Sequence, residues 1–196
     1  MQNNPKTRAT IWLAGAAIAV SLTAALPARA AEPRVAATFT AMTANMTPAD
    51  IELRIQIIAW QEADARSKAV ATLAAGKDAD PPLAKLPTVG YIWPAESPVG
   101  YSVKYAQRTP QAGGGERITL VTDRRLGSYD FKPWSAPGAA TTDAPYSVVE
   151  LYLNESGTGS GNLSLAAKTA LDEAAGTVSL AGGPGPGNLL VNVKRQ

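Results

Sequence analysis

The amino-acid sequence predicts a mainly β fold: an antiparallel β-sandwich or a partly open barrel with one packed α-helix. Two observations lead to this prediction. Apolar and polar residues alternate in most segments after residue 50, and side chains of a strand point in turn to its two faces. Clusters of glycine, proline and small polar residues separate these segments, as in antiparallel β proteins. No internal repeat or second boundary is visible, so residues 31–196 are expected to form one domain.

Residues 1–30 are organised like a cleaved secretory signal peptide. Lys6 and Arg8 form a basic start, an apolar run extends from Ile11 to Ala25, and Ala28-Arg29-Ala30 fits a small-x-small cleavage site. The apolar run is shorter than the roughly 20 residues that a membrane-spanning helix needs. We therefore expect cleavage after Ala30, a periplasmic or secreted protein of a bacterial cell envelope, and no membrane span in the processed chain.

The charge balance argues against nucleic acid as a partner. The full chain has 18 basic and 16 acidic side chains and a net charge of +2. Lys6, Arg8 and Arg29 leave with the signal, so the processed chain keeps 15 basic against 16 acidic side chains and has a net charge of −1. A near-neutral protein lacks the positive field that attracts polyanions.

The chain contains no histidine and no cysteine. This composition excludes a Ser-His-Asp triad, a cysteine nucleophile, a disulfide and a zinc site built from histidine or cysteine. No motif specifies a cofactor or a metal, and we expect neither. Acid–base chemistry would depend on carboxylates, tyrosine and lysine.

The first part of the domain is expected to contain two strands and the helix. An initial strand is predicted around 35–42, and 51–57 alternates strictly between apolar and polar residues. Thr47-Pro48-Ala49-Asp50 is typical of a helix start, but three isoleucines at a period of two favour a strand for the segment that follows. Asp64 can cap a helix over residues 64–75 that ends at Gly76. The proline-rich segment 77–87 is predicted to be a surface connection.

The remaining strands are predicted at 89–93, 100–108, 117–123, 146–154, 162–171, 177–181 and 189–194, which makes eight or nine in all. Segments 100–108 and 117–123 are expected to pair as a hairpin, and 172–176 is expected to be a hairpin turn. Residues 124–145 form a long loop. Gly157-Thr158-Gly159-Ser160-Gly161 is interpreted as a turn, because a phosphate-binding loop would need a helix after it.

The strongest candidate for a binding site follows the strand at 117–123. Asp123, Arg124 and Arg125 place a carboxylate beside two guanidinium groups, which can bind a carboxylate or phosphate through paired hydrogen bonds. Tyr129 and Trp134 in the loop could stack on a ligand if they are exposed, or form core if they are buried. The plainer interpretation of the charged group is a turn aspartate with solvated or loop-locking arginines.

Two alternatives remain open. Glu116, Asp123, Asp130 and Glu150 lie at strand ends or in the loop, so two of them could face each other as in a carboxylate-dependent hydrolase of envelope polysaccharide. Alternating strands could also form a small outer-membrane barrel. The helix, the short strand at 89–93 and the basic end Lys194-Arg195 argue against the second alternative.

Several segments resemble an uncharacterised family of secreted bacterial proteins: 51–60 with its helix, Gly90-Tyr91, 100–106, 115–124 and 148–153. The resemblance implies secretion and a single domain, and it implies no active-site residue. The sequence thus favours a non-enzymatic secreted binding or interaction module whose partner is an envelope component or another protein.

Overall fold

The computed structural model describes residues 35–75, 82–130, 133–139 and 145–196. The predicted signal peptide at 1–30 lies outside the described residues, as does the start of the predicted connection at 77–87. In the part of the chain that is described, no helix combines the length and the apolar character needed to span a membrane.

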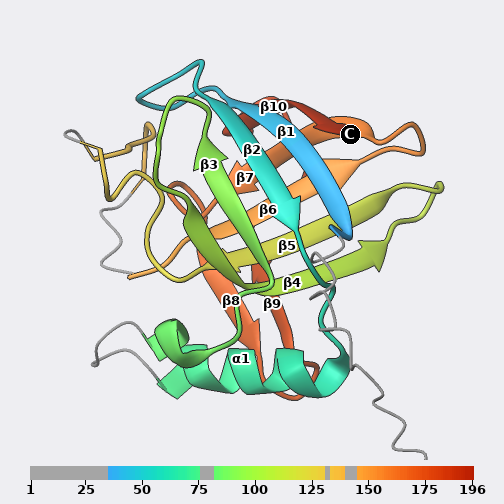
Figure 1. The fold of residues 1–196 in the computed structure, drawn as a ribbon. Helices are drawn as coiled ribbons and strands as arrows, with labels where there is room; N and C mark the ends of the chain where they lie inside the picture. Colours follow the sequence, from blue (N-terminus) through green and yellow to red (C-terminus); the bar gives the residue numbers. More distant parts are fainter. Residues whose placement is uncertain (1–34, 76–81, 131–132, 140–144) are drawn as a thin grey trace, which may run out of the picture. The chain divides into compact units, whose positions relative to one another are not determined.

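Eight antiparallel strands form a closed barrel in the order β1-β10-β7-β6-β5-β4-β3-β2 (Figure 1). Strands that are consecutive in the sequence lie side by side, except that β10 fits between β7 and β1. Pairing of Phe39 with Arg195 belongs to the seam that closes the barrel. The strands are β1 (Ala37–Thr43), β2 (Glu52–Ile57), β3 (Gly90–Pro94), β4 (Tyr101–Pro110), β5 (Glu116–Thr122), β6 (Val148–Leu153), β7 (Thr158–Leu163) and β10 (Leu190–Arg195).

The mainly antiparallel β prediction is confirmed, whereas the sandwich or open barrel is replaced by a closed barrel. A period of two shows which face of each strand is buried, but it does not show which strands are neighbours. The pairing of β1 with β10, from opposite ends of the described chain, is therefore absent from the pattern. The predicted hairpin of 100–108 with 117–123 is confirmed as β4 and β5.

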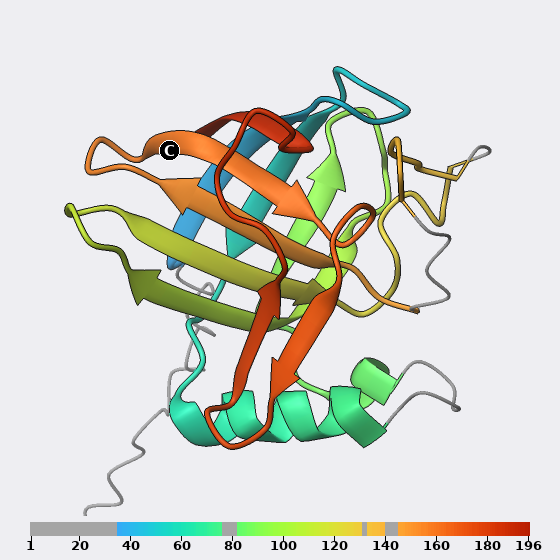
Figure 2. The same cartoon turned by 180° about the vertical axis from the view of Figure 1, so that it is seen from behind.

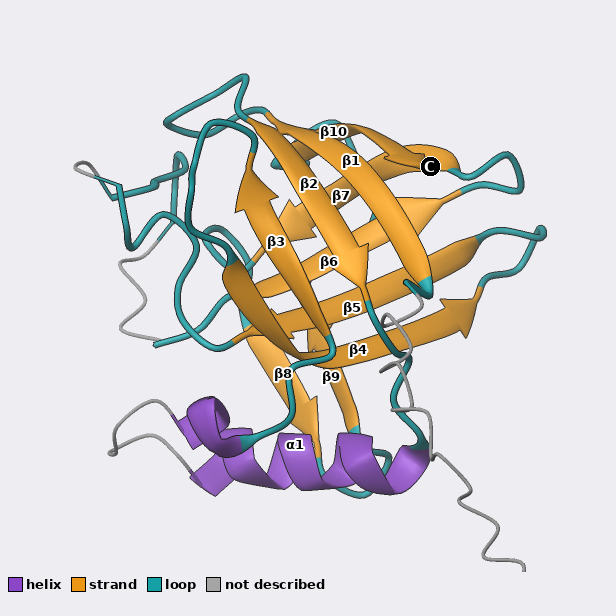
Figure 3. Ribbon diagram, viewed as in Figure 1, coloured by secondary structure: helices purple, strands orange, loops and turns teal. Residues whose placement is uncertain are grey.

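The predicted helix is confirmed as α1 (Ala63–Ala75), with Asp64 in its first turn (Figure 3). A short 3₁₀ helix, η1 (Pro82–Lys85), lies within the segment predicted to be a surface connection. The turn predicted at 172–176 joins β8 (Thr169–Asp172) to β9 (Thr177–Leu180), which form a separate two-stranded sheet beside the barrel (Figure 2).

Two predictions around β7 were wrong. The glycine-rich segment 157–161 was predicted to be a turn, yet β7 begins at Thr158. A Cβ atom at Gly159 would lie 1.8 Å from the backbone oxygen of Tyr152, so glycine allows close approach to β6 rather than a reversal of the chain. The strand predicted at 162–171 is divided, because β7 ends at Leu163 and β8 begins only at Thr169.

Two hydrophobic clusters share the barrel wall. The first fills the interior and includes Phe39, Leu53, Ile92, Leu120 and Leu151. The second lies outside β4, β5 and β6, where α1, η1 and the β8–β9 hairpin cover the wall. The pairing of β4 with β5 shifts its register between Val103 and Tyr105. Because of this shift, Val103 packs in the first cluster and Tyr105 packs in the second.

Candidate functional site

Three of the five residues predicted to bind a ligand form a partly exposed cluster after β5. The Asp123 carboxylate lies 3.5 Å from the Arg124 guanidinium. The guanidinium carbon of Arg124 lies 5.1 Å from the centre of the Tyr129 ring, a cation–π arrangement. Tyr129 is 45% exposed and its ring lies 5.0 Å from that of Tyr101. The structure thus brings Asp123, Arg124 and Tyr129 together, and their role in binding stays a prediction.

The other two predicted residues hold the loop in place. Trp134 is 1% exposed and belongs to the interior cluster, so its ring forms core and does not offer a stacking surface. The Arg125 guanidinium donates a hydrogen bond to the Trp134 backbone oxygen at 3.0 Å. The Trp134 indole N–H donates to the carboxylate of Asp130. Gly127 has a φ of 79°, and a Cβ atom there would lie 2.4 Å from the indole, so glycine suits both backbone and packing.

The loop after β5 closes one end of the barrel. Thr47, in the β1–β2 connection, exchanges two backbone hydrogen bonds with Ser135 beside Trp134. Inside the barrel, the Tyr101 hydroxyl accepts the backbone N–H groups of Gly127 and Tyr129. Burial raises the pKa of Tyr101 above its usual 10.0. Within the described part of the loop, the backbone is therefore held at Gly127 and Tyr129 on one side and at Ser135 on the other.

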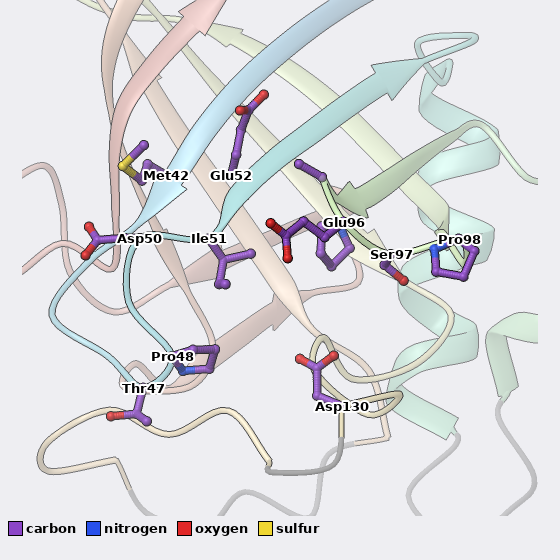
Figure 4. Close-up of a pocket in the computed structure, with 12 residues that line it drawn as sticks. Met42, Thr47, Pro48, Asp50, Ile51, Glu52, Glu96, Ser97, Pro98 and Asp130 are labelled. Atoms are coloured by element: carbon purple, nitrogen blue, oxygen red, sulfur yellow. The ribbon is translucent and has the colours of Figure 1, made fainter.

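A cavity of about 720 Å³ lies at this end of the barrel. It is formed by the β1–β2 connection, the β3–β4 connection and the loop after β5. Figure 4 shows Ile51 and Glu96 from the first two connections, with Asp130 on the loop and its carboxylate directed towards them. Its lining includes four carboxylates, Asp50, Glu52, Glu96 and Asp130, together with apolar groups such as Met42, Ile51, Pro94 and Pro98.

The four carboxylates singled out from the sequence lie in separate places. Glu116 lies at the opposite end of the barrel and pairs with Arg195. Glu150 is fully buried on the outside of the wall, where its carboxylate accepts the Leu180 backbone N–H at 3.2 Å. The Asp123 carboxylate pairs with the Arg124 guanidinium. Of the four carboxylates, only that of Asp130 lines the cavity.

Sequence reasoning missed Asp50, Glu52 and Glu96. Asp50 ends the segment 47–50, which is typical of a helix start, Glu52 lies on the polar face of the predicted strand at 51–57, and Glu96 follows the predicted strand at 89–93. Alternate connections of an up-and-down barrel share one end, so a correct topology would have placed both segments beside the loop after β5. The signal that could have identified these residues is the recurrence of acidic side chains in every second connection between strands.

Within the ranges that the structure describes, no three acidic side chains converge as metal ligands. Comparison of the chain with protein-family models, with curated proteins and with solved structures gives no match. The chemistry of the cavity is therefore the basis for assigning a function.

Proposed function

We propose that this chain is a secreted, non-enzymatic binding module and that the cavity at the end of the barrel binds a basic peptide segment of a partner. The observation that carries the proposal is the one-sided charge of this cavity. Asp50, Glu96 and Asp130 line it, together with Glu52, whose carboxylate lies 3.9 Å from Arg54 outside the lining; no lysine or arginine of the described residues lines the cavity. Its volume of about 720 Å³ is in the range typical of ligand sites.

The electrostatics favour a cationic ligand. A cleft lined by charges of one sign concentrates the field and attracts ligands of the opposite sign. The processed chain as a whole is expected to be close to neutral, so this attraction comes from the local arrangement of carboxylates. Apolar groups such as Ile51 and Pro98 provide contact area for the methylene stems of lysine or arginine side chains.

Secretion is supported by the signal-like organisation of residues 1–30 and by the absence of cysteine, which leaves the fold independent of redox conditions. An exported module with a shaped acidic cavity would meet basic segments of envelope proteins.

The test is a calorimetric titration of the protein with a lysine-rich octapeptide at low and high salt. We expect saturable binding that weakens with salt, because exposed charges are screened. Replacing Asp50→Asn together with Glu96→Gln should weaken binding about tenfold, while Asp130 is left to hold Trp134. The matched control is Glu62→Gln with Glu173→Gln, two exposed acids outside the cavity lining. Absence of binding, or equal weakening by both pairs, would contradict the proposal.

A second candidate is a carboxylate-dependent hydrolase of envelope polysaccharide. It is supported by Glu96 and Asp130, which line the same cavity from different connections and could act as a pair. Release of reducing ends from purified envelope polysaccharide, lost in both Glu96→Gln and Asp130→Asn, would favour the hydrolase over the binding module. No release by the wild-type protein would remove this candidate.

A further inference from the structure

The outer face of β1, β2 and β3, with the start of β4 beside it, has a chemistry that the cavity does not share. Tyr91 and Trp93 point outward from β3, and both are half-buried. Their ring centres are 5.2 Å apart and their planes are inclined by 31°. Figure 1 views the barrel from the side on which β1, β2 and β3 lie in front. Two adjacent aromatic rings therefore lie on the outside of β3, which, unlike that of β4, β5 and β6, has no residue in the cluster formed with α1, η1 and the β8–β9 hairpin.

The position of the Trp93 ring depends on Gly100. A Cβ atom at residue 100 would lie 2.3 Å from the indole nitrogen of Trp93. The space that glycine leaves at the start of β4 lets the indole rest on the backbone, so its orientation is set before any ligand arrives. Pre-positioned aromatic rings lose little conformational freedom on binding.

Hydrogen-bonding groups surround the two rings. In the pairing of β2 with β3, Arg54 is opposite Trp93 and Gln56 is opposite Tyr91. In the pairing of β3 with β4, Ser102 is opposite Tyr91. Within the described residues, no protein hydrogen bond is made by the side-chain polar groups of Thr38, Gln56, Tyr91, Trp93 or Ser102.

A hollow of about 390 Å³ lies on this face, lined by Trp93 together with Thr38, Arg54 and Gln56. It continues around the rim towards the acidic cavity, because Pro94, Ala95 and Ser97 line both. The charge differs, however. Arg54 is the only charged residue that lines the hollow among the described residues, and the Glu52 carboxylate lies 3.9 Å from its guanidinium. The hollow is therefore close to neutral.

We infer that this face is a second binding site and that its ligand is a neutral saccharide chain. A pyranose ring has an apolar C–H face that packs on aromatic rings, and hydroxyl groups around its edge that exchange hydrogen bonds with amide, hydroxyl and guanidinium groups. Trp93 and Tyr91 supply the rings; Gln56, Ser102 and Arg54 supply the polar groups. A purely apolar partner would leave these polar groups buried without partners, which opposes binding.

The test follows the indole N–H signal of Trp93 in two-dimensional NMR spectra while the protein is titrated with maltohexaose, cellohexaose and chitohexaose. The Trp93→Phe variant assigns the signal. We expect at least one hexasaccharide to shift it saturably, with a Kd of about 1 mM or tighter. In the variants, which lack this indole, binding is followed by the backbone amide signals of β2 and β3. Trp93→Ala should weaken binding about tenfold or more, and Trp93→Phe should keep most of it, because a phenyl ring retains the stacking surface.

Gln56→Ala provides a variant that is expected to fold normally, since its side-chain amide has no protein partner among the described residues. It should weaken binding about threefold to tenfold without changing the melting temperature. Tyr129→Ala is the matched control, an exposed aromatic residue on a different surface. The inference is overturned if none of the three hexasaccharides shifts the Trp93 signal at about 10 mM, or if Tyr129→Ala weakens binding as much as Trp93→Ala.

This inference does not rest on the proposed peptide site, although Pro94, Ala95 and Ser97 line both the hollow and the cavity. Asp50→Asn with Glu96→Gln should leave saccharide binding unchanged, and Trp93→Ala should leave peptide binding unchanged. Loss of one activity alone therefore identifies which of the two assignments fails.

Discussion

The interior of the barrel and the layer outside β4, β5 and β6 are both buried, but they are built differently. The interior cluster consists of apolar side chains, with Thr43 and Thr122 at the end closed by the loop. The outer layer contains apolar side chains and also Glu150, Lys104 and Tyr105, each buried and each hydrogen-bonded. The stability of the interior depends on how well apolar side chains fill it, whereas the stability of the outer layer also depends on specific hydrogen bonds.

The polar groups of the outer layer attach the added elements to the wall. The Lys104 ammonium donates to the Leu86 backbone oxygen at 2.9 Å, next to η1. The Tyr105 hydroxyl lies 3.1 Å from the backbone oxygen of Gly176, in the β8–β9 turn. The Glu150 carboxylate accepts the Leu180 N–H of β9. A hairpin with only four residues in each strand is marginal alone, and these contacts determine where it lies.

The largest effect is expected in the interior. Leu151→Ala should lower the free energy of unfolding by about 2–5 kcal/mol, because a closed barrel cannot collapse around the cavity. Leu73→Ala in α1 should fall at the lower end of that range, since the helix can shift against the wall. Urea denaturation with an unchanged m-value measures both. A larger loss for Leu73→Ala would contradict the distinction between a rigid and an adjustable layer.

An intermediate effect is expected at the polar contact. Glu150→Gln keeps the shape of the side chain but removes the charge, and it should lower the free energy of unfolding by about 1–3 kcal/mol. The comparison predicts that this loss is local. Hydrogen exchange should accelerate at Leu180 and across the hairpin, while the β5–β6 amides keep their protection. Uniform acceleration over the whole chain would show that the two layers unfold together.

The smallest effect is expected at Tyr152, whose hydroxyl donates to Glu150. Tyr152→Phe should lower the free energy of unfolding by about 0.5–1.5 kcal/mol at neutral pH. Burial, and then the hydrogen bond to Glu150 and its charge, raise the pKa of Tyr152 above its usual 10.0. The protonated hydroxyl therefore stabilises the fold below pH 10.0, and this contribution is lost as the pH rises through the raised pKa.

Wild-type protein should accordingly lose more stability than Tyr152→Phe between about pH 9 and about pH 11, measured by urea denaturation. Tyr146→Phe is the control, because burial alone raises the pKa of Tyr146, without a carboxylate partner. Parallel pH profiles for the wild type and Tyr152→Phe would exclude a contribution from the Glu150 contact.

The sequence predicted which face of each strand is buried, but it did not predict which strands pair with each other. Alternation placed Leu53, Ile55 and Ile57 on the buried face of β2, and the structure has them fully buried. It could not reveal that Glu150 and Thr119, polar residues on the outer face, are buried as well. Their burial depends on the β8–β9 hairpin folding back over β5 and β6, a long-range event without a local pattern.

The candidate site was predicted only in part, because a local pattern does not show which distant segments come together. Adjacent residues such as Asp123 and Arg124 were recognised because they are neighbours in the sequence, and the structure keeps them in contact. The ring of Trp134 is core because the loop turns it into the end of the barrel. Asp50 and Glu96 line the same cavity only through the topology, so no local motif indicated them.

The seam between β1 and β10 has a consequence for biosynthesis. Ribosomes deliver the chain from its N-terminus, so β1 exists long before the strand that must cover its free edge. Until Leu190–Arg195 has emerged, both β1 and β7 expose unpaired backbone groups that can recruit other nascent chains. A polypeptide lacking its last seven residues would thus be expected to aggregate even with most of its apolar core intact. Pairing of β10 with both neighbours closes the circle and covers the two remaining edges of the wall at once.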